Sequence, residues 1–161
     1  MIKAVTAALL LSFSIVAFTQ PSPEQIAEYR AAAAKGEAWG QYNLGRMYAK
    51  GEGVAEDDAT AVKWYTKAAE QEYADAQGNL GLMYANGWGV PEDNVTAYMW
   101  FNLAAAQGTE LARTKKGIME DKMTPADISK AQTLSRECLA KDYKDCPLHT
   151  SDAATEDRGV E

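Results

Sequence analysis

Residues 44–71 read LGRMYAKGEGVAEDDATAVKWYTKAAEQ, and residues 80–107 read LGLMYANGWGVPEDNVTAYMWFNLAAAQ. The second stretch begins 36 residues after the first, and the two share most of their glycine, alanine and aromatic positions. Chance does not keep such a register over a whole unit, and a fixed period of this length is typical of repeat proteins. The sequence therefore predicts a repeat architecture.

Each unit predicts two helices joined by a glycine-rich turn. Tyr48 lies on the apolar stripe of the first helix, and Gly51 opens a loop whose glycines suit the left-handed backbone found after many helix ends. Asp57 stands where a carboxylate accepts the first amides of a second helix, whose apolar stripe includes Trp64. Gly45 lowers helix propensity by about 1 kcal/mol relative to Ala. We therefore expect a neighbouring helix to approach closely there.

These motifs resemble the Sel1-like repeat family, relatives of the tetratricopeptide repeats. Their units look like A-x-A-Q-x-x-L-G-x-x-Y-x-x-G-x-G-V-x-x-D, followed by A-x-x-W-Y-x-x-A-A-x-Q-G. The second unit fits best, and the first departs at Gly40 and Glu72. The resemblance implies an all-α fold, an α-α superhelical solenoid of helix-turn-helix repeats. Within a repeat domain over residues 22–143, full units are expected at about 38–73 and 74–109, with partial units before and after.

Two further segments carry the chemistry of helix starts. Ser22-Pro23 with Gln25, and Thr124-Pro125 with Asp127, each combine a capping hydroxyl, a first-turn proline and a polar third residue. The segment from Pro125 to about Lys141 resembles the long terminal helix that often closes Sel1-like arrays, which implies a C-terminal capping helix.

The two ends of the chain have compositions unlike the repeats. Residues 1–19 have a short basic start and an apolar run, the layout of a secretory signal peptide, with an uncleaved anchor as the alternative. Residues 147–161 are polar and acidic, which predicts a disordered tail. The signal together with the repeats predicts a bacterial protein that is periplasmic or secreted, with no membrane insertion after the signal is removed.

The charge and the cysteine content limit which kinds of ligand and site the chain can have. The formal net charge of −7 disfavours nucleic acid and anionic membrane surfaces. Cys138 and Cys146 are the only cysteines, and in an exported protein an even count indicates a structural disulfide rather than a redox-active pair. No Cys and His cluster offers a metal site, so we expect neither a metal nor another cofactor.

By register with tetratricopeptide repeats, the first helix of each unit should face a concave side that holds a protein or peptide partner. The predicted partner-binding residues are Trp39, Tyr42, Arg46, Lys50, Leu82, Asn86 and Trp88, and the same register adds Asp75, Leu111, Thr114 and Ile118. Trp, Tyr and Arg are enriched at binding hot spots, which favours the first three as a contact patch. The alternative is that Trp39 and Tyr42 pack on the helix expected over residues 24–35. Trp88 is either an exposed contact residue or packs over Pro91.

The sequence contains no catalytic constellation that holds together. His149 is the only histidine and lies in the expected tail, and the acidic pairs at Asp57 and Asp93 stand at helix starts. We therefore predict a non-enzymatic interaction scaffold. One alternative is a β-lactamase or penicillin-binding-like enzyme, as in cysteine-rich Sel1-like relatives, although those carry a cysteine pair in each repeat. The other is an accessory or regulatory factor of an envelope complex. The partner and the oligomeric state are not specified by the sequence.

Overall fold

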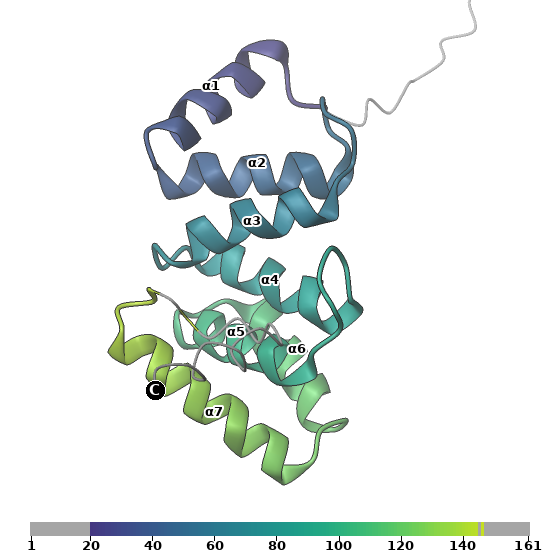
Figure 1. The fold of residues 1–161 in the computed structure, drawn as a ribbon, viewed down its shortest axis with the longest axis vertical. Coiled ribbons are helices and arrows are strands. Elements are labelled where there is room, and N and C mark those ends of the chain that lie inside the picture. The colour runs from purple at the N-terminus through teal and green to yellow at the C-terminus, as the bar shows by residue number, and fades with distance from the viewer. Residues whose placement is uncertain (1–19, 145, 147–161) are drawn as a thin grey trace, which may run out of the picture.

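The computed structural model describes residues 20–144 and 146, and the predicted signal segment 1–19 and tail 147–161 lie outside them. The described residues form seven α-helices and no strand. The helices are α1 (Pro23–Ala34), α2 (Ala38–Lys50), α3 (Asp58–Ala69), α4 (Ala74–Asn86), α5 (Asn94–Ala106), α6 (Glu110–Glu120) and α7 (Pro125–Ala140). They stack in chain order along the long axis of the molecule (Figure 1). The predicted all-helical repeat fold is confirmed.

Each helix packs against the next one along the chain up to α6. α2 with α3 and α4 with α5 form the two full units, and α1 packs on α2 as the second helix of a preceding partial unit. At the other end, α5 contacts both α6 and α7. We call α2, α4 and α6 the A helices, because each stands first in its unit, and α3 and α5 the B helices.

The glycine in the middle of each A helix lets the B helix of the same unit come close. A Cβ atom on Gly45 would lie 2.6 Å from the ring of Tyr65, and one on Gly81 would lie 2.5 Å from the ring of Phe101. Both contacts are shorter than atoms tolerate, so a side chain at either glycine would push the helices apart. The expected close approach at these glycines is confirmed.

The turn between the two helices of a unit is built the same way twice. Gly51 and Gly87 follow α2 and α4 with φ of 65° and 67°, the left-handed backbone that favours glycine. Asp57 then caps α3 by accepting a hydrogen bond from the Thr60 amide at 3.0 Å, and Asp93 caps α5 through the amides of Val95 and Thr96. The hydrogen bonds from Thr60 hold the pKa of Asp57 below its usual value. The predicted capping role of these acids is confirmed.

The core is thin at the N-terminal end and thick toward the C-terminal end. The smaller cluster has only Ala33, Leu44 and Met47 as buried members, between α1, α2 and α3. The larger cluster runs from α3 to α7 and contains Trp100 and Phe101, which are almost fully buried. The array is therefore held most firmly around α5.

The last helix closes the array and carries the disulfide. Thr124 caps α7 by accepting a hydrogen bond from the Asp127 amide, and the Ser135 hydroxyl donates to the Ala131 carbonyl on the buried side. Cys138, buried on α7, is bonded to Cys146, so the chain beyond the helix is tied back onto it. This bond joins the only two cysteines of the chain.

Candidate binding face

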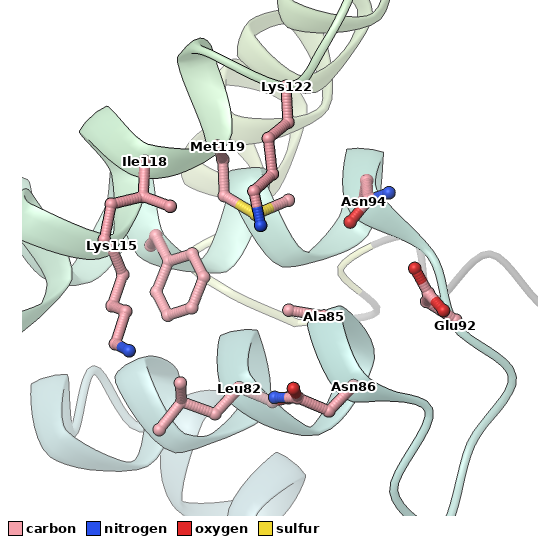
Figure 2. A pocket seen from close by; sticks show the side chains of 10 residues that line it. Leu82, Ala85, Asn86, Glu92, Asn94, Lys115, Ile118, Met119 and Lys122 are labelled. Atoms are coloured by element: carbon pink, nitrogen blue, oxygen red, sulfur yellow. The ribbon is translucent and has the colours of Figure 1, made fainter.

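The A helices lie along one side of the array, and two hollows open on that side. The first hollow, of about 250 Å³, lies between α2 and α4. The second, of about 210 Å³, lies between α4 and α6, and Figure 2 shows the side chains that line it. Leu82 of α4 lines both hollows and so separates them. We call this surface the A-helix face.

The first hollow brings together three of the residues that the sequence predicts for partner binding. Lys50 from the end of α2, Leu82 from α4 and Trp88 from the loop after α4 all line it. Trp88 is 49% exposed, so its indole is available to a partner. Asp58 and Tyr65 complete the wall from α3.

The second hollow has a mixed apolar and charged lining. Its floor includes Leu82, Phe101 and Met119, and Ile118 stands at its edge with 44% of its surface exposed. The polar lining residues are Asn86, Glu92, Asn94, Lys115 and Lys122. Of the residues predicted from sequence, this hollow contains Leu82, Asn86 and Ile118.

Trp39, Tyr42 and Arg46 lie on α2 but line neither hollow. The ring of Trp39 packs edge-on against Tyr29 of α1, with centroids 6.1 Å apart, and its indole N–H donates to Glu37 at 2.8 Å. Trp39 therefore does contact the preceding helix, as the alternative interpretation holds, while 36% of it stays exposed.

Tyr42 is half-buried in a cluster of tyrosines. Its ring centroid lies 5.0 Å from that of Tyr73 and 5.9 Å from that of Tyr65, so its partners come from α3 and the start of α4 rather than from α1. Burial, followed by the nearby carboxylate of Asp75, raises the pKa of Tyr42. Burial also raises the pKa of Tyr65. Tyr42 therefore packs on residues of its own unit, up to the N-cap of α4, and presents only part of its ring.

Arg46 and Lys50 share one acidic partner. Glu52, in the loop after α2, lies 3.5 Å from the Arg46 guanidinium and 3.9 Å from the Lys50 ammonium. The Arg46 Nε is buried and donates to no described residue. Arg46 thus keeps an unused donor beside the tyrosine cluster.

Sequence reasoning missed Lys115 of α6 and Lys122 of the turn that follows it. Lys122 does stand in the repeat register, 72 residues after Lys50, so extending the pattern into the partial third unit could have found it. Lys115 stands in register with Asn43 and Asn79, so both full units carry an asparagine where the partial third unit has a lysine. The repeat pattern gave no indication of its role.

No group of three or more His, Cys, Asp or Glu side chains within residues 20–144 and 146 is arranged to hold a metal ion. The acidic residues at Asp57 and Asp93 are occupied as helix caps, and His149 lies outside the described residues. Across that same part of the chain, every helix is either too short or too polar to cross a bilayer. The described residues present two open hollows on one face of the helical array.

These features define a class: an all-α repeat protein that presents a grooved face built by the first helix of each unit. Residues 40–73 and 74–109 each match the Sel1 repeat. The chain belongs to the Sel1 repeat family, whose repeats generally mediate protein interactions.

Two solved structures support the fold. One is a protective antigen present in uropathogenic Escherichia coli strains, with an SLR fold; it is 31% identical over 86% of this chain, with a TM-score of 0.70. The other is a Sel1 repeat protein from Oxalobacter formigenes, 43% identical over 52% of this chain, with a TM-score of 0.51. This chain spans 30% of the length of the first and 64% of the second. No curated protein gives a significant match.

Proposed function

We propose that this Sel1 repeat protein is a non-enzymatic scaffold that holds a segment of another protein along its A-helix face. The observation that carries the proposal is the pair of adjacent hollows on either side of Leu82. A segment lying across α2, α4 and α6 would place successive side chains into them.

The size of the hollows supports a segment of polypeptide over a small molecule. Small-molecule sites usually enclose about 300–1,000 Å³. The hollows of about 250 and 210 Å³ are each smaller than that range, and both are open to solvent along the same face. Each therefore suits one or two side chains of a longer ligand.

Exposed apolar side chains around the hollows support the same function. Trp88 borders the first hollow and Ile118 the second, and Leu111 is exposed near the start of α6. Clustered exposed apolar residues mark interaction sites more often than scattered ones do. Trp39 and Arg46 extend the proposed contact surface along α2, because Trp39 and the side chain of Arg46 are each 36% exposed. Tyr42 contributes the part of its ring that packing leaves open.

We further propose that the protein works in the periplasm or outside the cell, with residues 22–143 as the repeat domain. The basic and apolar start of the sequence supports export, and the Cys138–Cys146 disulfide suits an oxidising compartment. The similar structure from uropathogenic Escherichia coli is a protective antigen, which is consistent with a location that antibodies reach. The predicted absence of membrane insertion and nucleic-acid binding is part of the same proposal.

Site-directed photo-crosslinking in the native envelope tests the proposal. A photoreactive phenylalanine derivative replaces Trp88, Ile118 or, as a control, Leu139 of α7, three apolar residues that are 49%, 44% and 47% exposed. We expect the same partner adduct from Trp88 and Ile118 and none from Leu139. An adduct of equal yield at Leu139, or no adduct at any position, would contradict binding on the A-helix face.

A second substitution guards against chance proximity. Leu82→Asp places a carboxylate between the two hollows and should abolish both adducts while leaving the helical circular dichroism unchanged, since Leu82 is only partly buried. Adducts that persist in the Leu82→Asp chain would show that the crosslinked protein does not occupy the hollows.

A further inference from the structure

The hollow between α4 and α6 holds two lysines with no acidic partner. Among the described residues, no ion pair joins Lys115 or Lys122 to a carboxylate, whereas their neighbour Lys116 pairs with Glu120 at 3.8 Å. The chain as a whole has a net charge of −7, so unpaired cations gathered at one hollow run against its overall charge. This local excess of positive charge favours a negatively charged ligand.

The two lysines are spaced to contact one extended segment. Lys115 lies on α6, and Lys122 lies in the turn directly after it, where its amide still donates to the Met119 carbonyl at 3.0 Å. Because this turn continues the helical path, the seven positions between the two lysines cover about 10 Å. An extended chain covers that distance in about three residues. Figure 2 shows Lys115, from α6, and Lys122, from the turn after α6, both pointing toward the α4 side of the hollow.

The surface between the two lysines is apolar. Ile118 and Met119 lie between them on α6, and Leu82 and Phe101 face them from α4 and α5. Because Ile118 is 44% exposed, a ligand side chain placed there would remove apolar surface from water. The hollow therefore suits an apolar residue flanked by acidic ones.

Amide side chains line the α4 and α5 side of the hollow. Asn86 lines the hollow and uses its amide N–H to donate to the Leu82 carbonyl at 2.7 Å, while no hydrogen bond between described residues engages its Oδ1, which could accept one from a backbone N–H. Asn94 offers a second amide at the start of α5. Glu92 lies beside it at that end of the hollow, where its negative charge would repel an acidic residue.

On these grounds we propose that the α4–α6 hollow binds an acidic segment of the partner protein. In that segment an apolar side chain enters the hollow, and Asp or Glu residues on both sides of it pair with Lys115 and Lys122. The inference rests on the proposed function, because it names the chemistry of the segment that the A-helix face would hold.

Selection from a phage library of random dodecapeptides on the immobilised protein tests the inference. The enriched peptides should carry Asp or Glu two to four positions apart around an apolar residue. One enriched peptide is then made synthetically with a fluorophore, and its dissociation constant is measured by fluorescence anisotropy for four variants. The variants are Lys115→Gln/Lys122→Gln, Lys141→Gln/Lys144→Gln, Glu92→Gln and Leu82→Asp.

The lysine pair in the hollow should matter, and the control pair should not. Lys115→Gln/Lys122→Gln should weaken binding by about tenfold, because each partly exposed charge pair contributes at most about a factor of five. Lys141 and Lys144 are exposed beyond α7 and give the same change in net charge, so their double variant should bind as the original protein does. Glu92→Gln should tighten binding, an opposite effect that a loss of folding would not produce.

The outcomes separate this inference from the proposed function. Enriched peptides without acidic residues, or with equal affinity for the Lys115→Gln/Lys122→Gln variant, would overturn the acidic segment while leaving the A-helix face as a binding surface if Leu82→Asp still abolishes binding. If no peptide is enriched, or if Leu82→Asp binds normally, the proposed function fails as well.

Discussion

The two full units share an interior but differ on the A-helix face. Inside, a glutamine of the A helix accepts a hydrogen bond from a glutamine after the B helix, at 2.7 Å between Gln41 and Gln71 and at 2.8 Å between Gln77 and Gln107. Outside, the loop position that is Glu52 in the first unit is Trp88 in the second. The same backbone therefore supports different surface chemistry.

The loop residue matches the helix before it in each unit. Where α2 presents Arg46 and Lys50, the loop supplies Glu52 to pair with both. In the equivalent positions α4 presents Leu82 and Asn86, and the loop supplies an exposed indole instead. The comparison shows that interior contacts fix the repeat, while the positions facing outward are available for recognition.

The largest expected difference in stability between the units concerns the tryptophan of the B helix, which is Trp64 in α3 and Trp100 in α5. Trp100 is 0% exposed in the larger core, whereas its counterpart Trp64 is only partly buried beside the smaller one and has the Lys67 ammonium 4.7 Å from its ring centroid. Trp100→Ala should lower the free energy of unfolding by about 3–5 kcal/mol, and Trp64→Ala by about 1–2 kcal/mol.

Equilibrium urea denaturation followed by circular dichroism measures both values. Trp100→Phe serves as the control, because it keeps an aromatic ring and deletes an indole N–H that no described residue accepts. It should cost less than Trp100→Ala, because the remaining ring fills part of the space that the indole occupies. Equal losses for the two alanine variants would show that the cores are equivalent.

The next largest difference in stability is expected at the second glycine of each loop, which is Gly53 in the first unit and Gly89 in the second. A Cβ on Gly89 would overlap the backbone of Asp58 at the start of α3, whereas one on Gly53 would meet only the tip of the Ile26 side chain, at 2.5 Å. Both glycines have positive φ, so the backbone strain of an alanine is shared and cancels in the comparison. Gly89→Ala should cost about 1–3 kcal/mol more than Gly53→Ala in urea denaturation. If the two cost the same, the loop of the second unit is free to move away from α3.

The next difference is expected in how the stability of each unit responds to high pH. Tyr98 replaces Val62 of the first unit, and its hydroxyl donates to the Glu120 carboxylate at 2.6 Å, so Tyr98→Phe should cost about 1 kcal/mol at neutral pH. Burial, followed by the hydrogen bond to Glu120, raises the pKa of Tyr98 from 10.0 to about 12. Because the folded pKa is the higher one, this stabilisation is present below pH 10 and is lost as the pH rises toward 12.

Urea denaturation of the original chain and the Tyr98→Phe variant at neutral pH, at pH 10 and near pH 12 measures this effect. The difference in the free energy of unfolding between the two proteins should become smaller as the pH rises from 10 to near 12. Tyr29→Phe, on α1, is the matched control, because it removes a phenol that forms no hydrogen bond with another described residue. A difference between the original chain and Tyr98→Phe that stays constant with pH would refute the assignment.

The smallest expected effect concerns the loop residues. Glu52→Gln removes the shared partner of Arg46 and Lys50 and should cost about 0.5 kcal/mol at low ionic strength, falling toward zero as salt is added. Trp88→Gln removes an exposed indole and should change stability by less than about 0.5 kcal/mol at any salt concentration. A salt-dependent loss for Trp88→Gln instead would remove the electrostatic distinction between the loops.

The helices, caps and turns of each unit could be predicted from the sequence, because they depend on contacts between residues that lie close together in the chain and recur in both units. The close approach at Gly45, the cap at Asp57 and the left-handed turn at Gly51 each involve a helix and its immediate neighbour. Such contacts recur every 36 residues, so the pattern in one unit supports the same structural prediction for the other.

The same reasoning could not assign the outward side chains individually. Tyr42 and Trp39 lie on one helix, yet Tyr42 packs against Tyr65 and Tyr73 while Trp39 packs against Tyr29. Those partners come from different units, and the 36-residue pattern does not say which of them a given ring will reach. The predicted contact patch on α2 therefore remains a prediction, and the structure adds Lys115 and Lys122 to the candidates.

The sequence by itself determined the family, the all-helical fold and the paired helices, because identical residues at a fixed period impose the same short-range contacts twice. Only the tertiary structure decided where the two hollows lie and that Leu82 separates them. A hollow forms where side chains from three or more helices fail to fill the space between them. That depends on the angles and distances at which the units stack, which no single unit encodes.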